Sequence, residues 1–343
     1  MTNDLWHTQA LTENRELLVS FVAYEHSKKH SPIQTNMNQP SMIVKVPDIP
    51  YGTLPRNVLD VYYHKKHTAK SPVIICIHGG MWCYSDKEVA AEMSINLAMR
   101  GYVVITPSYT LSSIRTIVPH LWGTMAGFSC VTSFFFSVTM HVAYLSILIL
   151  SWICVLVCDL STRQQASMQH PCHSNDIMSV WAWTQTNVSQ YHGNPKSCYL
   201  LGHSAGAHLA ALVGNMVGVD RCPGVISISG VYSDRMLRQL WLGGMILGNV
   251  FGDDYDKTNA FPVYNVTCGS PPHLLMNAEY DFSLKRHTYV YGLLLKVNQV
   301  GMKQISYPST NHFSIRKYWD RENKHILDDI CRFIESCESG YTN

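Results

Sequence analysis

The feature that most constrains this chain is the pentapeptide Gly-His-Ser-Ala-Gly at 202–206, which lies between an apolar run and a stretch of small residues. The run at 198–201 is typical of a buried strand, and residues 207–213 have the composition of a buried helix. We therefore predict a strand, a tight turn and a helix, in which glycines let strand and helix approach closely. Such a turn projects its central hydroxyl, so Ser204 is the candidate nucleophile. An ordinary strand-to-helix turn is the alternative interpretation.

A pair of glycines follows another predicted strand. The continuous apolar run at 72–77 is typical of a strand covered on both faces, and it leads into His-Gly-Gly-Met-Trp at 78–82. Glycines at the end of a central strand allow backbone N–H groups to face a ligand without obstruction by side chains. In an acyl-transfer enzyme such groups form an oxyanion hole with the N–H that follows the nucleophile. Gly79, Gly80 and Ala205 are the candidate donors, with a plain glycine loop as the alternative.

Two more candidate groups follow strands in the last third of the chain. The strand predicted at 273–278 is followed by Glu279 and Asp281, and the loop after the strand predicted at 304–307 carries His312. Open α/β sheets bind ligands at the carboxyl ends of their strands, so Asp281 is the candidate acid and His312 the candidate base. Glu279 is the second choice for the acid. A helix cap at Asp281 and a turn histidine at His312 are the simpler alternatives.

The other apolar patterns predict strands and helices in alternation, which is typical of a parallel sheet. Two strands are expected near one edge, and residues 236–266 are expected to form a cap or pocket wall. The further expected strands are 43–46, 57–63, 102–106 and 224–230, and the expected helices are 13–27, 86–100, 173–190 and 326–334.

Composition excludes several classes of function. The 26 Lys and Arg against 24 Asp and Glu give a net charge of +2, so a surface that grips nucleic acid is not expected. The 11 cysteines include no Cys-x-x-Cys pair, which favours free thiols in a reducing compartment. The chain lacks zinc-ligand spacing and a Gly-x-Gly-x-x-Gly motif, so neither a metal nor a cofactor is expected.

We divide the chain into a polar leader or cap segment at 1–45 and one domain at 46–343. The N-terminus lacks the basic start and apolar core of a secretory signal, so a cytoplasmic protein is expected.

An apolar segment at 113–160 does not match the rest of this pattern. No Asp, Glu, Lys or Arg lies between Arg115 and Asp159, and residues 142–158 are nearly long enough to span a membrane. One interpretation is membrane association through 128–158, in the endoplasmic reticulum. The other is an insertion, such as a retained intron in a gene model, because residues 108–112 and 161–171 would form an ordinary connection if joined.

The sequence order of glycine pair, serine, acid and histidine is that of the α/β-hydrolase triad. Together with the motifs at 78–82, 202–208 and 311–313, it resembles the α/β-hydrolase superfamily over about 50–112 and 161–335. The similarity lies in the branch of kynurenine formamidases, isoprenylcysteine methylesterases and related carboxylesterases. It implies an α/β-hydrolase fold, in which a mostly parallel central sheet has helices on both faces and a small cap.

The resemblance also implies a function and a role for each candidate residue. The expected activity is a serine hydrolase that cleaves a small carboxylic ester or an N-formyl aryl amide through an acyl-enzyme. The implied catalytic residues are Ser204, Asp281 and His312, and the implied oxyanion donors are Gly79, Gly80 and Ala205. The alternatives are a membrane-associated esterase similar to prenylcysteine methylesterases and an inactive hydrolase-like binding protein. The sequence does not indicate an oligomeric state.

Overall fold

The computed structural model describes residues 42–66, 70–113, 168–239, 243–281, 284–315 and 325–340. The leader up to residue 41, with its predicted helix at 13–27, lies outside these residues. So does the apolar segment proposed as an insertion or membrane span, except for Ser113. Among the described residues, no helix is long and apolar enough to cross a membrane.

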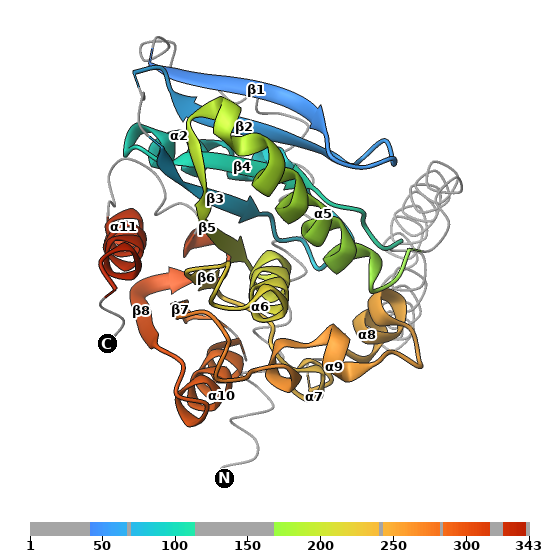
Figure 1. Ribbon diagram of the computed structural model, residues 1–343. Helices are drawn as coiled ribbons and strands as arrows, with labels where there is room; N and C mark the ends of the chain where they lie inside the picture. The colour runs from blue at the N-terminus through green and yellow to red at the C-terminus, as the bar shows by residue number, and fades with distance from the viewer. Residues whose placement is uncertain are drawn as a thin grey trace, which may run out of the picture.

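The described chain is built on one eight-stranded sheet in the order β1-β2-β4-β3-β5-β6-β7-β8 (Figure 1). β1 pairs antiparallel with β2, and β2 pairs antiparallel with β4. All pairs from β4 to β8 are parallel, which confirms the predicted mostly parallel sheet. The strands are β1 (Ile43–Pro50), β2 (Val58–His64), β3 (Ser71–Ile77), β4 (Val103–Ser108), β5 (Gly193–His203), β6 (Val225–Ile228), β7 (His273–Tyr280) and β8 (Met302–Asn311).

Helices cover both faces of this sheet, as predicted (Figure 1). α2 (Ala91–Met99) and α11 (His325–Glu338) bury apolar side chains in one core with the sheet. α5 (Cys172–Asn187), α6 (Ala205–Val217) and α10 (Leu284–Val297) bury theirs in a second core on the opposite face. Since the sheet separates two apolar cores, β3 and the apolar part of β5 are buried on both sides.

Several predicted boundaries differ from the structure. β1 continues through Pro47 to Pro50, past its predicted end at residue 46. It is an edge strand, where a proline need not donate to a neighbour. The helix predicted at 86–100 begins as a 3-10 turn, η1 (Lys87–Ala90), before α2, and the one predicted at 173–190 ends as the 3-10 turn η2 (Val188–Tyr191).

The expected cap region consists of short helices. They are α7 (Asp234–Leu237), α8 (Gly243–Phe251), α9 (Lys257–Ala260) and the 3-10 turn η3 (Pro262–Tyr264). Phe251 packs edge-on against Trp82, with ring centroids 5.3 Å apart, and Phe261 packs against His208 of α6 at 5.4 Å. These aromatic contacts attach the short helices to the loop after β3 and to α6.

Candidate active site

Ser204 occupies the tight turn between β5 and α6 that the sequence predicts. Its backbone has φ 57° and ψ −119°, a conformation that residues other than glycine rarely adopt. Its N–H donates to the carbonyl of Ile228 on β6 at 2.9 Å, and its carbonyl accepts from the N–H of His208 at 3.1 Å. The turn is therefore tied to a neighbouring strand and to the first turn of the helix.

Two glycines make this turn sterically possible. A Cβ at Gly202 would lie 2.2 Å from the backbone carbon and oxygen of Gly206, and a Cβ at Gly206 would lie 2.1 Å from the carbonyl oxygen of Ile77. These neighbours are backbone atoms, which cannot move away as the end of a flexible side chain could. Strand β5, helix α6 and strand β3 therefore meet at a distance that only glycine permits.

His312 lies between Ser204 and Asp281. Its Nε2 lies 3.0 Å from Ser204 Oγ, and its Nδ1 lies 2.9 Å from Asp281 Oδ1. When Nδ1–H donates to the carboxylate, Nε2 is unprotonated and accepts the serine hydroxyl proton. The exposed fractions are 9%, 6% and 1% for Ser204, His312 and Asp281, so the hydrogen-bonded chain is largely screened from water.

The second oxygen of Asp281 is also hydrogen-bonded. Oδ2 accepts from Asn277 Nδ2 at 3.1 Å and from the N–H of Ala278 at 3.3 Å. The same amide of Asn277 donates to Thr288 Oγ1 at 3.0 Å. Burial acts to raise the pKa of Asp281, but its interaction with His312 and the donor from Asn277 outweigh it, so the pKa is lowered. Asp281 is thereby kept ionised beside His312.

Glu279, the second choice for the acid, has its carboxylate elsewhere. Its side chain is exposed, and Oε2 accepts from the N–H of Ser309 at 2.7 Å. The structure brings Asp281, and not Glu279, to His312.

A bulge in β8 lies just before His312. Between the Ala278–Tyr307 pair and the Tyr280–Asn311 pair, β8 has two more residues than β7. Ser309 has φ 57° within the bulge, and Thr310 Oγ1 bridges the two strands by donating to the carbonyl of Tyr307 and accepting from the N–H of Glu279. The strand predicted at 304–307 therefore continues to Asn311, because pairing resumes after the bulge.

Of the three proposed oxyanion donors, Gly79 contacts Ser204 and Ala205 directly follows it in the chain. A Cβ at Gly79 would be 3.2 Å from Cβ of Ser204, so the backbone of Gly79 lies directly against the turn. Gly80 has φ 119°, and its carbonyl accepts from the N–H groups of Cys83 and Tyr84 at 3.0 Å. Ala205 is the first residue of α6, so its N–H has no acceptor within that helix.

His208, the last residue of the motif at 202–208, has a structural role. Its Nδ1 accepts from Trp82 Nε1–H at 3.2 Å, and its Nε2–H donates to the carbonyl of Ala260 at 2.7 Å. Burial lowers the pKa of His208 to about 3, so the ring is neutral at ordinary pH. It links the loop after β3 to the end of α9. The sequence did not indicate this role or the contacts of Asn277, because their partners are distant in the chain and follow no local pattern.

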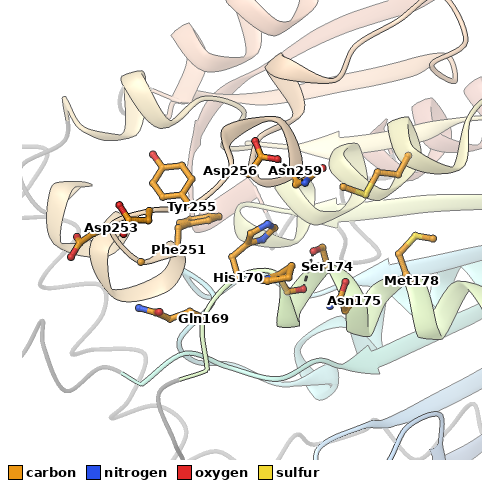
Figure 2. A pocket seen from close by; sticks show the side chains of 14 residues that line it. Gln169, His170, Ser174, Asn175, Met178, Phe251, Asp253, Tyr255, Asp256 and Asn259 are labelled. Carbon is orange, nitrogen blue, oxygen red and sulfur yellow. Dashed lines mark hydrogen bonds between the residues drawn. The ribbon is translucent and has the colours of Figure 1, made fainter.

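The structure also has a cavity of about 700 Å³ between the start of α5 and the segment that joins α8 to α9 (Figure 2). Its lining includes His170, Phe251 and the carboxylates of Asp253, Asp254 and Asp256. None of the predicted site residues lines it. Within the described part of the chain, no three His, Cys, Asp or Glu side chains are grouped as a metal site would require.

A protein-family model connects the chain to esterases in sequence. The model described as BD-FAE matches residues 59–121 and 155–226, which include the glycine pair and the turn at Ser204. The unmatched stretch between the two parts falls inside the predicted insertion.

Curated relatives are distant. A kynurenine formamidase of Danio rerio is 24% identical over 297 residues, which are 84% of this chain and 81% of that protein. An isoprenylcysteine alpha-carbonyl methylesterase of Arabidopsis thaliana is 24% identical over 48% of this chain and only 26% of its own length.

Solved esterase structures share the fold. Esterase B from Lactobacillus rhamnosis superposes with a TM-score of 0.66 over 97% of both chains, at 16% identity. A further structure of this enzyme, with a tributyrin phosphonate inhibitor, has a TM-score of 0.67 over 96% of both chains, at 17% identity. The sheet order, the turn at Ser204 and the superposition together show an α/β-hydrolase fold, and in sequence the chain is similar to esterases.

Proposed function

We propose that this protein is a serine hydrolase that cleaves a small carboxylic ester or an N-formyl aryl amide through an acyl-enzyme. One observation carries the proposal. Ser204 Oγ, the ring of His312 and Asp281 form a continuous hydrogen-bonded chain of 3.0 and 2.9 Å, and the serine lies on a strained turn. A serine beside a base that is itself oriented by a carboxylate is the arrangement that activates a hydroxyl for nucleophilic attack.

In the first half of the reaction, Oγ of Ser204 attacks the carbonyl carbon while Nε2 of His312 takes the hydroxyl proton. Asp281 holds the proton on Nδ1 and stabilises the imidazolium that forms. The tetrahedral intermediate collapses when His312 returns the proton to the leaving alcohol or arylamine. The acyl group then remains on Ser204 as an ester.

In the second half, water attacks this ester with His312 again as the base, and the products are the free acid and the restored serine. Both tetrahedral intermediates carry a negative oxygen. The backbone N–H groups of Gly79, Gly80 and Ala205 are the proposed donors to it. Removal of one oxyanion donor in enzymes of this chemistry typically costs about 10²–10³ in kcat.

The substrate class is proposed from the relatives and from the reaction chemistry. The zebrafish relative is named a kynurenine formamidase, and the related plant protein is named a methylesterase. Their shared reaction is attack of a nucleophile on an ester or amide carbonyl. The phosphonate-inhibited esterase supports a small ester as the first substrate to test.

Labelling with a fluorophosphonate probe tests the proposed nucleophile. We expect the purified full-length chain to be labelled and the Ser204→Ala variant to remain unlabelled, with the same thermal midpoint. Hydrolysis of N-formylkynurenine, a prenylcysteine methyl ester and p-nitrophenyl acetate would then place the substrate within the class. A wild-type chain that folds but neither reacts with the probe nor hydrolyses any of these substrates would favour the binding-protein alternative.

A further inference from the structure

His203 lies directly before Ser204 and makes a second contact with His312. Its Nε2–H donates to the backbone carbonyl of His312 at 3.0 Å, and the centroids of the two rings are 4.8 Å apart. The side chain of His203 is buried, with 6% exposed. Two successive residues therefore contact His312: Ser204 contacts the ring nitrogen, and His203, the last residue of β5, contacts the backbone.

The ring of His203 is also confined on a second side. A Cβ at Gly79 would lie 3.1 Å from His203 Nδ1 and 2.8 Å from its carbonyl oxygen. The backbone of Gly79 therefore lies against His203. With Gly79 on one side and the ring of His312 near it, the imidazole of His203 has little room to rotate away from the carbonyl that it contacts.

The other hydrogen bonds in the turn at His312 have a different character. The side-chain oxygen of Asn311 accepts from the N–H groups of Phe313 and Ser314 at 3.0 and 2.8 Å, and these bonds are exposed. They shape the turn locally because both partners lie within three residues of Asn311. The bond from His203 instead spans 109 positions of sequence and joins the turn to the strand that carries the nucleophile.

We propose that His203 is a positioning residue, which holds the backbone of His312 so that Nε2 stays opposite Ser204 Oγ. The proposal rests on the proposed serine hydrolase function. His203 does not touch the reacting atoms, and it acts through the placement of His312. A displacement of about 1 Å in a reacting group can cost about 10²-fold in rate. Loss of the His203 donor should therefore lower kcat and leave KM nearly unchanged.

Two substitutions separate the hydrogen bond from the packing. His203→Gln places an amide N–H at the same reach as Nε2, whereas His203→Phe keeps a planar ring but has no donor. His273→Phe is the matched control, because His273 is also a buried histidine but lies at the opposite, N-terminal end of β7. For each variant we would measure the fluorophosphonate labelling rate, kcat and KM for p-nitrophenyl acetate, and the thermal midpoint.

We expect His203→Phe to lower kcat and the labelling rate about 10²-fold, with less than about a threefold change in KM. His203→Gln should keep activity within about fivefold of wild type, since an amide donor replaces a ring donor. Equal losses in the Gln and Phe variants, or an active Phe variant, would overturn the positioning role while the wild-type chain still reacts. An unreactive wild-type chain would overturn the proposed function itself, and the positioning role with it.

Discussion

Ser204 lies on a turn held by contacts between backbone atoms, whereas Asp281 and His312 are held mainly by hydrogen bonds of side chains. Around Ser204, an added Cβ at either motif glycine would come within 2.2 Å of backbone. Around Asp281 and His312, the bonds come from Asn277 and His203 at 3.0–3.1 Å. Both regions contribute to one hydrogen-bonded chain, but the first is fixed by steric exclusion and the second by a small number of directional bonds.

This difference has a consequence for substitutions. Backbone atoms cannot move aside independently, so a larger residue at Gly202 or Gly206 should affect the fold itself. Directional bonds can be removed one at a time, so changes around the acid and base should produce graded losses of rate with little effect on the fold. The following substitutions test that contrast.

Among the residues that hold His312, the largest effect on rate is expected at the acid. In Asp281→Asn the amide can donate to Nδ1, which would place the proton on Nε2 and prevent it from accepting the proton of Ser204. We expect kcat for p-nitrophenyl acetate to fall about 10⁴-fold, a loss typical of the wrong histidine tautomer. Glu279→Gln, two positions away, is the matched control and should stay within about threefold. The opposite ranking of the two variants would assign the acid to Glu279.

The comparison of wild type with Asp281→Asn also predicts how stability depends on pH. The pKa of Asp281 is lowered in the folded chain, so its contribution is present above the unfolded value of about 3.9 and is lost as pH falls through the folded pKa. The difference in unfolding free energy between wild type and Asp281→Asn should therefore shrink as the pH falls below about 4. Urea unfolding at a series of pH values measures it, and a difference that grows toward acid would contradict the lowered pKa.

A side chain added at a glycine of the serine turn should destabilise the fold through steric clash. Gly206→Ala places a Cβ 2.1 Å from the carbonyl oxygen of Ile77, and we expect a loss of about 3 kcal/mol or more in the free energy of unfolding. Gly244→Ala in α8 is the control, since a Cβ there meets nothing within 4 Å. It should be neutral or stabilise by up to about 1 kcal/mol, because alanine favours helices over glycine. Similar stabilities for the two variants would show that the turn can relax.

Removing one bond to the acid should have an intermediate effect. Asn277→Leu has similar volume but lacks the donor to Asp281 Oδ2, and we expect kcat to fall about 30-fold, as for a hydrogen bond to a charged group. Thr288→Val removes the other acceptor of Asn277 and a hydrogen bond to the carbonyl of Leu284, but no bond to Asp281, so it should cost less than about threefold. If Thr288→Val were as damaging as Asn277→Leu, the effect would lie in the packing of β7 against α10.

The smallest effect is expected from removing the apolar segment. Ser112 Oγ donates to the carbonyl of Met168 at 2.6 Å, so the chain on the two sides of residues 114–167 is hydrogen-bonded together. Replacing 114–167 with a short Gly/Ser linker should therefore keep the labelling rate of Ser204 within about threefold. Loss of labelling would mean that the segment belongs to the working fold, and loss of membrane attachment in carbonate-washed fractions would support the span.

The parts of the fold that follow from the sequence are those with local causes. The apolar run of β3 and the glycines around Ser204 predict a buried strand and a tight turn, because both patterns act within a few residues. Asp281 and His312 could be placed at strand ends, since the carboxyl ends of parallel strands meet along one edge. Their contact with each other and with Ser204 required the structure.

The rest depends on contacts between distant residues. Pro308 marks a strand end in the sequence, but β8 continues because Glu279 and Thr310 bond across the bulge. The pentapeptide does not indicate the bond from His203 to His312. The acceptor is a backbone carbonyl 109 positions away, and its place depends on where β8 ends.

The bulge in β8 also determines which kind of mutation the site tolerates. The two extra residues preserve the alternation of side chains, but they shorten the reach of β8 by about 7 Å compared with a regular strand of the same length. The location of His312 thus depends on the number of residues between Tyr307 and Asn311, and only partly on which residues they are. Deletions between Tyr307 and Asn311 should therefore be far more harmful than substitutions.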